Sequence, residues 1–489
     1  MENDTKDQEI LDHKPKKEDN LYWFSFPAKL RLMILEILLQ EHHGLASYAS
    51  VCKEWQLAVE KKNFRQLKLR RELVKKVWLN IELPKYTCRS CGFYASESWA
   101  SRNKSIIRKA ISKLFSILST WNPVGPGITL ELSAHSLSDS EHWFKNYCFG
   151  AGTKDEDTAF GTGNQEVIPK WHDPKHGWID GEQVVTPDGL AISRLFEMVD
   201  LRFPEPLLEF PVVTSFILRR QVRRRLTPST LRLLFEKLPR LECIIYEPWR
   251  IWTTLIQENY DREYQFMIQA GLPKTLKRIS LFEDFNDSHI TPLQILRRSI
   301  LQIGPIRHAD PKVGTALAHK SRSLEQLSAS YIVDARHFFQ ATQPLWTWNH
   351  LQSLVLTSQL LTHTSNCTEI SGLLHDAGVA ALSMPKLHTM AIWNGRKGEA
   401  CAFIYQRKDD SSSITWRGTW DLELRSNMVE AWERVGAKFT RSGIRVEKQR
   451  LCGDVISSHG DAIYQLDLPC GVIDPISLWQ IQREAIGRT

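Results

Sequence analysis

The N-terminal part of the chain begins with a helical pattern whose apolar residues fall on two sides. From Pro27 onward, apolar residues recur at helical spacing, and Arg31 and Glu36 separate them into two stripes. The stripes consist of Leu30, Met33, Ile34, Ile37 and Leu38 on one side, and of Leu32, Leu35 and Leu39 on the other. A helix that is apolar on two faces must be covered twice, and a unit of this size buries too little surface to do so alone. We therefore predict that one stripe packs on Val51 and Trp55 within its own unit and that the other contacts a partner.

Strand and helix patterns follow along the middle of the chain. VWLNIEL at 77–83 and GITLELS at 127–133 alternate as strands do, and the apolar residues of 106–118 have the spacing of an amphipathic helix. Residues 150–190 are rich in Gly, Asp, Pro and Lys and predict a long irregular loop. After residue 400, CAFIYQ and SITWRG predict a β pair. Residues 426–439 predict a helix capped by Ser426 or Asn427.

Five later segments share one pattern, in which a leucine is followed by apolar residues three and five positions on. They begin at Leu241, Leu276, Leu324, Leu351 and Leu387. A helical stretch, a tight turn and a Leu-rich strand are typical of a leucine-rich-repeat solenoid. We predict that the five leucines are buried and begin adjacent parallel strands, and that IRVEK, DAIYQL and DPISLWQIQRE cap the far end. An ordinary α/β domain with Leu-rich strands is the alternative.

The composition narrows the class of protein. The chain has 489 residues, 63 Lys and Arg against 56 Asp and Glu, and a mild net charge of +7 that does not by itself predict a polyelectrolyte partner. A hydrophobic fraction of 42%, with 17 Trp, supports a large core rather than disorder. No apolar run is long enough for a membrane span, and the charged residues 1–20 predict a disordered arm rather than a secretory signal. We therefore expect an intracellular protein of the cytoplasm or nucleus, without membrane contact, whose nine cysteines are reduced.

Residues 26–69 resemble the F-box, and in particular the F-box-like opening of a group of filamentous-fungal proteins with a long uncharacterised C-terminal region. The matching elements are Phe26-Pro27, the helix from Leu30 to Leu39, Leu45, Val51-Cys52, Trp55 and Phe64-Arg65-Gln66-Leu67. The segments ITLELSAHS, SDSEHWF, YEPWR, FEDFN and IDPISLWQI extend the resemblance over most of residues 22–486. Phe26 stands where the family usually has Leu, and Lys29 stands where it often has an acidic residue.

The resemblance implies an α+β or α/β chain with a three-helix F-box-like unit at 21–70. A linking α/β segment would follow at 71–149, then the loop at 150–190, and then a leucine-rich-repeat-like region with a C-terminal cap at 191–489. It further implies a non-catalytic substrate receptor of a cullin–RING ubiquitin ligase, without a cofactor, that binds the F-box adaptor and presents protein cargo. The implied adaptor-binding residues are Phe26, Pro27, Leu30, Leu32, Ile34, Leu35, Leu38 and Leu39. An F-box interaction module that acts outside ubiquitin ligation is the alternative.

Aromatic and charged residues cluster after the predicted repeat strands. They could form a cargo-binding rim, because such residue types make binding hot spots, or could fill the turn cores. These residues are Trp249, Arg250, Glu283, Asp284, Phe285, Asp334 and Trp393.

A basic run holds five arginines within Arg219–Arg225. A nucleic-acid-associated factor built on this run is a further alternative, but we favour a solvated turn whose arginines pair with acids on a neighbouring repeat.

Cys88 and Cys91 form a single CxxC, which supplies half of a zinc site. Cys148, His142 and His135 are the nearby candidates for the remaining ligands. Because there is no second CxxC, we expect reduced structural thiols and no metal. His172, Asp173 and His176 are expected to be loop residues, since Pro174 and Gly177 prevent a regular helix. The sequence has neither GxSxG nor HExxH, in keeping with a protein that is not an enzyme.

Overall fold

The computed structural model describes residues 23, 26–41, 51–52, 54–56, 58–59, 71–123, 125–149, 170–297, 304 and 306–485. Two compact units divide the chain, Met1–Leu73 and Val74–Thr489. The predicted arm at 1–20, Leu45, Phe64–Leu67 and residues 150–169 of the predicted loop lie outside the described residues.

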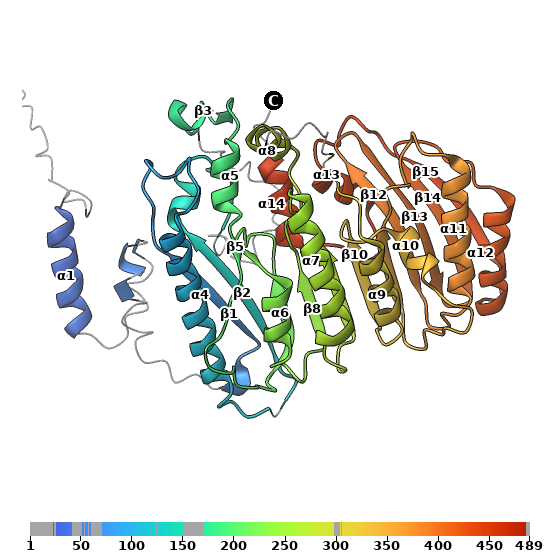
Figure 1. Ribbon diagram of the computed structural model, residues 1–489, viewed down its shortest axis with the longest axis horizontal. Coiled ribbons are helices and arrows are strands. Elements are labelled where there is room, and N and C mark those ends of the chain that lie inside the picture. The colour runs from blue at the N-terminus through green and yellow to red at the C-terminus, as the bar shows by residue number, and fades with distance from the viewer. Residues whose placement is uncertain are drawn as a thin grey trace, which may run out of the picture. The chain divides into compact units, whose positions relative to one another are not determined.

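An 11-stranded sheet forms the second unit, and its strands lie side by side in chain order (Figure 1). Neighbours are parallel except for β12–β13 and β13–β14, which are antiparallel. The strands are β1 (Lys76–Leu83), β2 (Ile128–Ser136), β6 (Val213–Leu218), β8 (Cys243–Tyr246), β9 (Arg278–Phe282), β10 (Gln326–Ser330), β11 (Ser353–Thr357), β12 (Thr389–Arg396), β13 (Glu399–Lys408), β14 (Ser411–Gly418) and β15 (Ile444–Arg450). Two small pairs lie outside this sheet, β3 (Trp178–Ile179) with β4 (Glu182–Gln183) and β5 (Met198–Val199) with β7 (Arg225–Leu226).

Helices connect the parallel strands and pack on the sheet. They are α4 (Glu97–Leu118), α5 (Gly189–Leu195), α6 (Pro228–Phe235), α7 (Thr254–Phe266), α8 (Ile290–Arg297), α9 (Pro311–Ser321), α10 (Ala335–Gln340), α11 (Cys367–Ala381), α12 (Ser426–Phe439), α13 (His459–Leu466) and α14 (Pro475–Ala485). Short 3-10 turns are η3 (Arg71–Leu73), η4 (Leu137–Ser140), η5 (Pro174–His176) and η7 (Asp287–His289), and η6 (Met267–Gly271) is a π-helical turn. None of the helices within the described residues has the length and apolar run that a membrane crossing requires.

Local sequence explains why α4 forms where it does. Ser96 caps the helix by accepting a hydrogen bond from the Trp99 amide. The buried residues Ile107, Ile111, Phe115 and Leu118 then recur every three or four positions and face the sheet. The predicted helix at 106–118 and the predicted strands at 77–83 and 127–133 are confirmed, as is the β13–β14 pair.

The central strands of the sheet are buried on both faces and therefore carry apolar side chains on both sides. On β11, Leu354 and Leu356 join the large core that the connecting helices cover, whereas Val355 belongs to a second core. That second core includes Ala462 and Ile463 of α13, which packs on β12 and β13. Successive side chains of one strand therefore point to opposite faces of the sheet, and each face packs against its own layer of helices.

The solenoid prediction is wrong, although the strands on which it rested are present. The leucines at 241, 276, 324, 351 and 387 are all buried, and the segments that they begin form the adjacent parallel strands β8 to β12. The architecture is nevertheless an α/β fold with one large, mostly parallel sheet, in which β12, β13 and β14 pair antiparallel before the parallel edge strand β15. The shared Leu pattern reports burial of parallel strands, which an α/β sheet requires as much as a repeat does.

Three further predictions need correction. A three-helix N-terminal unit is not indicated: the described residues there hold α1 (Ala28–Glu41) and helical residues at 54–56 and 58–59. The C-terminal helices do not cap the far edge at β15: α13 packs on β12 and β13 and reaches Asp284 after β9, and α14 reaches residues that follow β6 and β8. The cap of α12 is Arg425 rather than Ser426 or Asn427.

The two-sided burial of the central strands predicts a strong dependence of stability on their side chains. Leu354→Ala should lower the free energy of unfolding by about 2–5 kcal/mol, because Leu354 is fully buried and its loss leaves a cavity. Leu345, which is 93% exposed, provides a matched control, and Leu345→Ala should change stability by about 0.5 kcal/mol or less. Chemical denaturation of the full chain measures both, and equal effects would contradict the assigned core.

Candidate functional site

Helix α1 exposes a row of large apolar side chains. Leu30, Leu32, Met33 and Ile37 are 46, 55, 49 and 54% exposed. Helical spacing places Leu30, Met33 and Ile37 along one side. The row begins just after the exposed Pro27, where the resemblance implies adaptor binding. An exposed apolar cluster of this kind is typical of an interaction surface.

The opposite side of α1 faces its own unit. Leu35 is buried, while Ile34, Leu38 and Phe26 are half-buried; the side chain of Leu39 lies outside the description. Arg31 contributes to this side, because its Nε lies 3.1 Å from Glu54 Oε2.

Each of the two predicted stripes of α1 contains both exposed and covered residues. Leu30 is exposed while Ile34 is half-buried, and Leu32 is exposed while Leu35 is buried. The dividing residue Arg31 is itself half-buried and pairs with Glu54, so the covered side of the helix includes a charged residue. Val51, predicted to face inward, is 57% exposed, so only part of the predicted packing is present.

The predicted cargo residues meet at one place but are not exposed. Six of them follow a parallel strand and Trp393 lies within β12, so the topology gathers them toward the carboxyl edge of the sheet, where open α/β sheets usually bind ligands. All seven are buried, so the predicted rim is corrected to a set of core residues: Trp249, Arg250, Glu283, Asp284, Phe285, Asp334 and Trp393.

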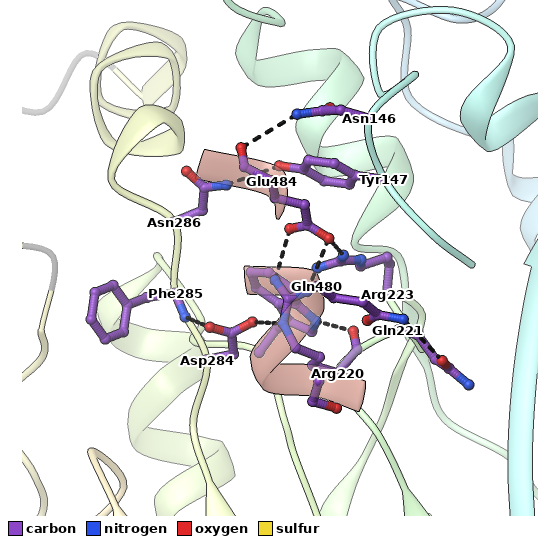
Figure 2. A network of polar contacts seen from close by, with 12 residues as sticks. Asn146, Tyr147, Arg220, Gln221, Arg223, Asp284, Phe285, Asn286, Gln480 and Glu484 are labelled. Carbon is purple, nitrogen blue, oxygen red and sulfur yellow. Dashed lines mark hydrogen bonds and ion pairs between the residues drawn. The ribbon is translucent and has the colours of Figure 1, made fainter. Parts of the chain in front are cut away.

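The C-terminal segment closes part of this edge. His459 Nε2 lies 2.8 Å from Asp284 Oδ1, and the Asp474 amide donates to Glu247 Oε1 at 2.9 Å. Glu484, on α14, accepts hydrogen bonds from Arg220 at 2.8 and 2.9 Å (Figure 2). Residues more than 170 positions apart in the sequence thereby share one buried polar network.

The basic run is the cationic half of this network. The arginines do pair with acids on neighbouring strands and helices, as predicted, but the predicted solvated turn is wrong because four of them are buried. The pairs are Arg219 with Glu131 and Asp474, Arg220 with Asp284 and Glu484, Arg223 with Glu484, and Arg224 with Asp139. Arg225 is half-buried with its guanidinium 5.2 Å from the Phe196 ring centre. This run therefore offers little exposed charge to the phosphates of a nucleic acid.

Electrostatics fix Asp284 as an anion. Burial alone would raise the pKa of this carboxyl, but the neighbouring Arg220 and His459 outweigh burial and hold the pKa at about 2. The same balance lowers the pKa of Glu484, where burial is outweighed by Arg220 and Arg223. The Arg223 guanidinium also lies 4.2 Å from the centre of the Trp249 ring.

Glu247 lies in the same region, and none of the described residues forms a salt bridge with it. Burial raises its pKa to about 7, against the hydrogen bonds that it accepts from the Ser477 hydroxyl and from the amides of Arg220 and Asp474. This carboxyl thus titrates near neutral pH, inside the contact between β8 and the C-terminal segment.

A compact Cys/His cluster lies in the loops before α5. The structure brings Cys88 and Cys91 together with His142 and His176, and their potential ligand atoms all lie within 4.8 Å of one another. Of the three partners considered from sequence, His142 is therefore present, whereas Cys148 and His135 are not in the cluster. His176 ends the short 3-10 turn η5, so no regular helix forms there, as expected, but its convergence with the CxxC was missed. A histidine next to a glycine turn was the available signal.

The ion network predicts that α14 is held by charge rather than by apolar contact alone. Glu484→Gln should lower the free energy of unfolding by about 3–5 kcal/mol, because it leaves Arg220 and Arg223 buried with one fewer anion. Glu236 pairs with Arg232 at the surface, so Glu236→Gln should cost less than about 1 kcal/mol. Urea denaturation compares the two variants, and a Glu484→Gln effect no larger than the control would contradict a network that stabilises this contact.

The raised pKa of Glu247 predicts that the stability of the fold depends on pH. Its folded pKa of about 7 lies above the ordinary 4.5, so between these values the folded state holds more proton and its stability falls as pH rises. The difference in free energy of unfolding between wild type and Glu247→Gln should therefore change by up to about 3 kcal/mol across this window, with the wild type losing stability. Denaturation at a series of pH values measures it, and parallel curves for the two proteins would contradict the assignment.

Comparison with known proteins identifies a similar family, but that family has no assigned activity. Residues 271–474 match the model of a family described as a family of unknown function (DUF6546). The matched stretch runs from the end of η6 through β9 to β15 and stops just before α14, so it includes neither α1 nor the Cys/His cluster. No curated protein matches the chain. The chain is thus similar, over the C-terminal part of its sheet, to a family without an assigned function.

Proposed function

We propose that this chain is a non-catalytic substrate receptor of a cullin–RING ubiquitin ligase. Its α1 segment would bind the F-box adaptor, and its α/β unit would present a protein cargo. The observation that carries the proposal is the exposed apolar row Leu30, Leu32, Met33 and Ile37, which follows Pro27 in the segment that resembles an F-box.

The division of the chain supports separate roles for its two parts. α1 lies in a compact unit that ends at Leu73, and the large sheet begins just after it. A receptor needs one surface for the ligase and another for cargo. Because the carboxyl edge is filled by its own residues, cargo would bind the outer surface of the α/β unit rather than the residues predicted from sequence.

The experiment is adaptor binding by the full chain with a double substitution in the exposed row. Met33→Ser combined with Ile37→Ser should weaken adaptor binding by two or more orders of magnitude, because full burial of each apolar side chain contributes about 1.5–3 kcal/mol. The melting temperature should barely change, since both side chains are about half exposed. Co-purification with the recombinant adaptor and thermal melting provide the two readings.

A matched control on the same helix is Glu36→Ser, which replaces an exposed polar side chain and should leave binding unchanged. Wild-type protein that retains the adaptor and a cullin supports the receptor. Wild-type protein that retains neither refutes it. If the exposed row then binds a different protein, the interaction module outside ubiquitin ligation is the better description.

A further inference from the structure

Four metal-ligand side chains converge from three separate segments. Cys88 and Cys91 come from the turn after β1, His142 from the turn after η4, and His176 from η5. The Sγ atoms of Cys88 and Cys91 each lie 3.4 Å from His176 Nε2. Tetrahedral Zn²⁺, with Zn–S of about 2.3 Å and Zn–N of about 2.0–2.1 Å, separates sulfur and nitrogen ligands by about 3.5 Å. The observed spacing therefore suits a single zinc ion.

The two histidines present their ring nitrogens in a way that suits a zinc ion. Asp173 Oδ2 lies 2.7 Å from His176 Nδ1, which fixes that ring and leaves Nε2 toward the two sulfurs. A carboxylate on the far nitrogen is the usual support of a zinc-bound histidine. In addition, His142 Nε2 is buried and has no hydrogen-bond partner within the described part of the chain. A buried ring nitrogen left without a partner is costly unless something binds it.

The local backbone holds both ligand-bearing turns in place. In the CxxC turn, the Ser90 amide donates to Thr87 O at 2.9 Å and the Phe93 amide donates to Ser90 O at 3.2 Å. After His176, Gly177 adopts a φ of +74°, and a Cβ there would lie 2.2 Å from Val185 O. Only glycine fits this turn without displacing the backbone, so the short β3–β4 pair that follows depends on it.

We propose that Cys88, Cys91, His142 and His176 bind one Zn²⁺ in a structural site. Four protein ligands close the coordination sphere and leave no position for a substrate, which is the arrangement of structural zinc. Binding releases the two thiol protons to solvent, and the resulting pair of thiolates balances the charge of the ion. The site goes beyond the proposed receptor function and does not depend on it.

The zinc ion would cross-link loops that are far apart in sequence. The turn that carries His142 already accepts hydrogen bonds at Trp143 O, from Trp178 Nε1 at 3.1 Å and Gln183 Nε2 at 2.8 Å. Arg194 of α5 donates to Phe93 O at 3.2 Å, next to the CxxC. The ion would join these two anchored groups and fix the loops beyond β1 and β2.

The first test is the metal content of the full chain, purified without chelator from zinc-supplemented cells. We expect one Zn²⁺ per chain by elemental analysis. Replacement by Co²⁺ should give the intense visible absorption of a tetrahedral site together with a thiolate charge-transfer band. A chain that contains no zinc and takes up no Co²⁺, or one that holds a Cys88–Cys91 disulfide instead, would overturn the proposal.

Substitutions then assign the ligands. Cys91→Ser and His176→Ala should each abolish stoichiometric zinc. Cys367→Ser and His172→Ala should retain it, because Cys367 is exposed and the His172 side chain is 60% exposed in the same loop as His176. Loss of zinc from the controls, or full zinc in the ligand variants, would refute the assignment.

Asp173→Ala keeps all four ligands and tests the site in a milder variant. Zinc affinity, measured by competition with a chromophoric chelator, should fall about 10–100-fold because the orientation of His176 is lost. Unchanged affinity would contradict the role given to the His176–Asp173 contact. Since the Co²⁺ spectrum and the chelator competition need no adaptor or cargo, failure of this site and failure of the receptor proposal are distinguishable.

Discussion

The buried ion network around Arg220 is the interaction on which the architecture of the second unit depends. Arg220 lies between Asp284, at the end of β9, and Glu484 on α14, so it joins the centre of the sheet to the C-terminal helix. Removing charges from water is expensive, and the cost is recovered only where each charge meets a partner in good geometry. The network therefore favours one position of α14 over others and closes the carboxyl edge near β6, β8 and β9.

This closure explains why the edge that usually binds ligands in an α/β sheet is filled here by the protein itself. Trp249 contacts two arginines face-on, and Glu247 is covered by residues of the C-terminal segment. A partner of such a unit would have to bind its outer surfaces or the loops beyond the edge. The apolar row of α1 and the Cys/His cluster both lie outside the closed network, in parts of the chain where side chains remain able to meet a partner or an ion.

The two proposals rest on different physics. Adaptor binding would depend on the burial of apolar side chains at the exposed face of α1, which is non-directional and scales with area. Zinc binding would depend on the geometry of four donors held by turns and by Asp173, and it would add local rigidity where short strands contribute little. One concerns the partner of the first unit, and the other concerns the internal order of the second.

By itself the sequence determined the local elements and several of their contacts. The strands at 77–83 and 127–133, the parallel strands at the five leucines and the arginine–acid pairing could all be read from pattern and charge. The apolar residues of α1 were visible as well, but not which of them would be covered, because that depends on the neighbours that the fold brings to the helix. The same periodicity fits a repeat and an open α/β sheet, since both bury parallel strands.

Only the tertiary structure decided where distant residues meet. The sequence spacing does not predict that Glu484 contacts Arg220, or that His176 contacts Cys88. Several strands or helices lie between the two residues of each pair, and only their packing brings the pair together. Two groups of residues that the sequence predicted to lie at the surface are buried in the structure. The arginines of the basic run form buried ion pairs, and the predicted cargo-binding residues pack inside the carboxyl edge of the sheet. Residue type and order fix which contacts are chemically possible, whereas packing fixes which of them are made and which face water.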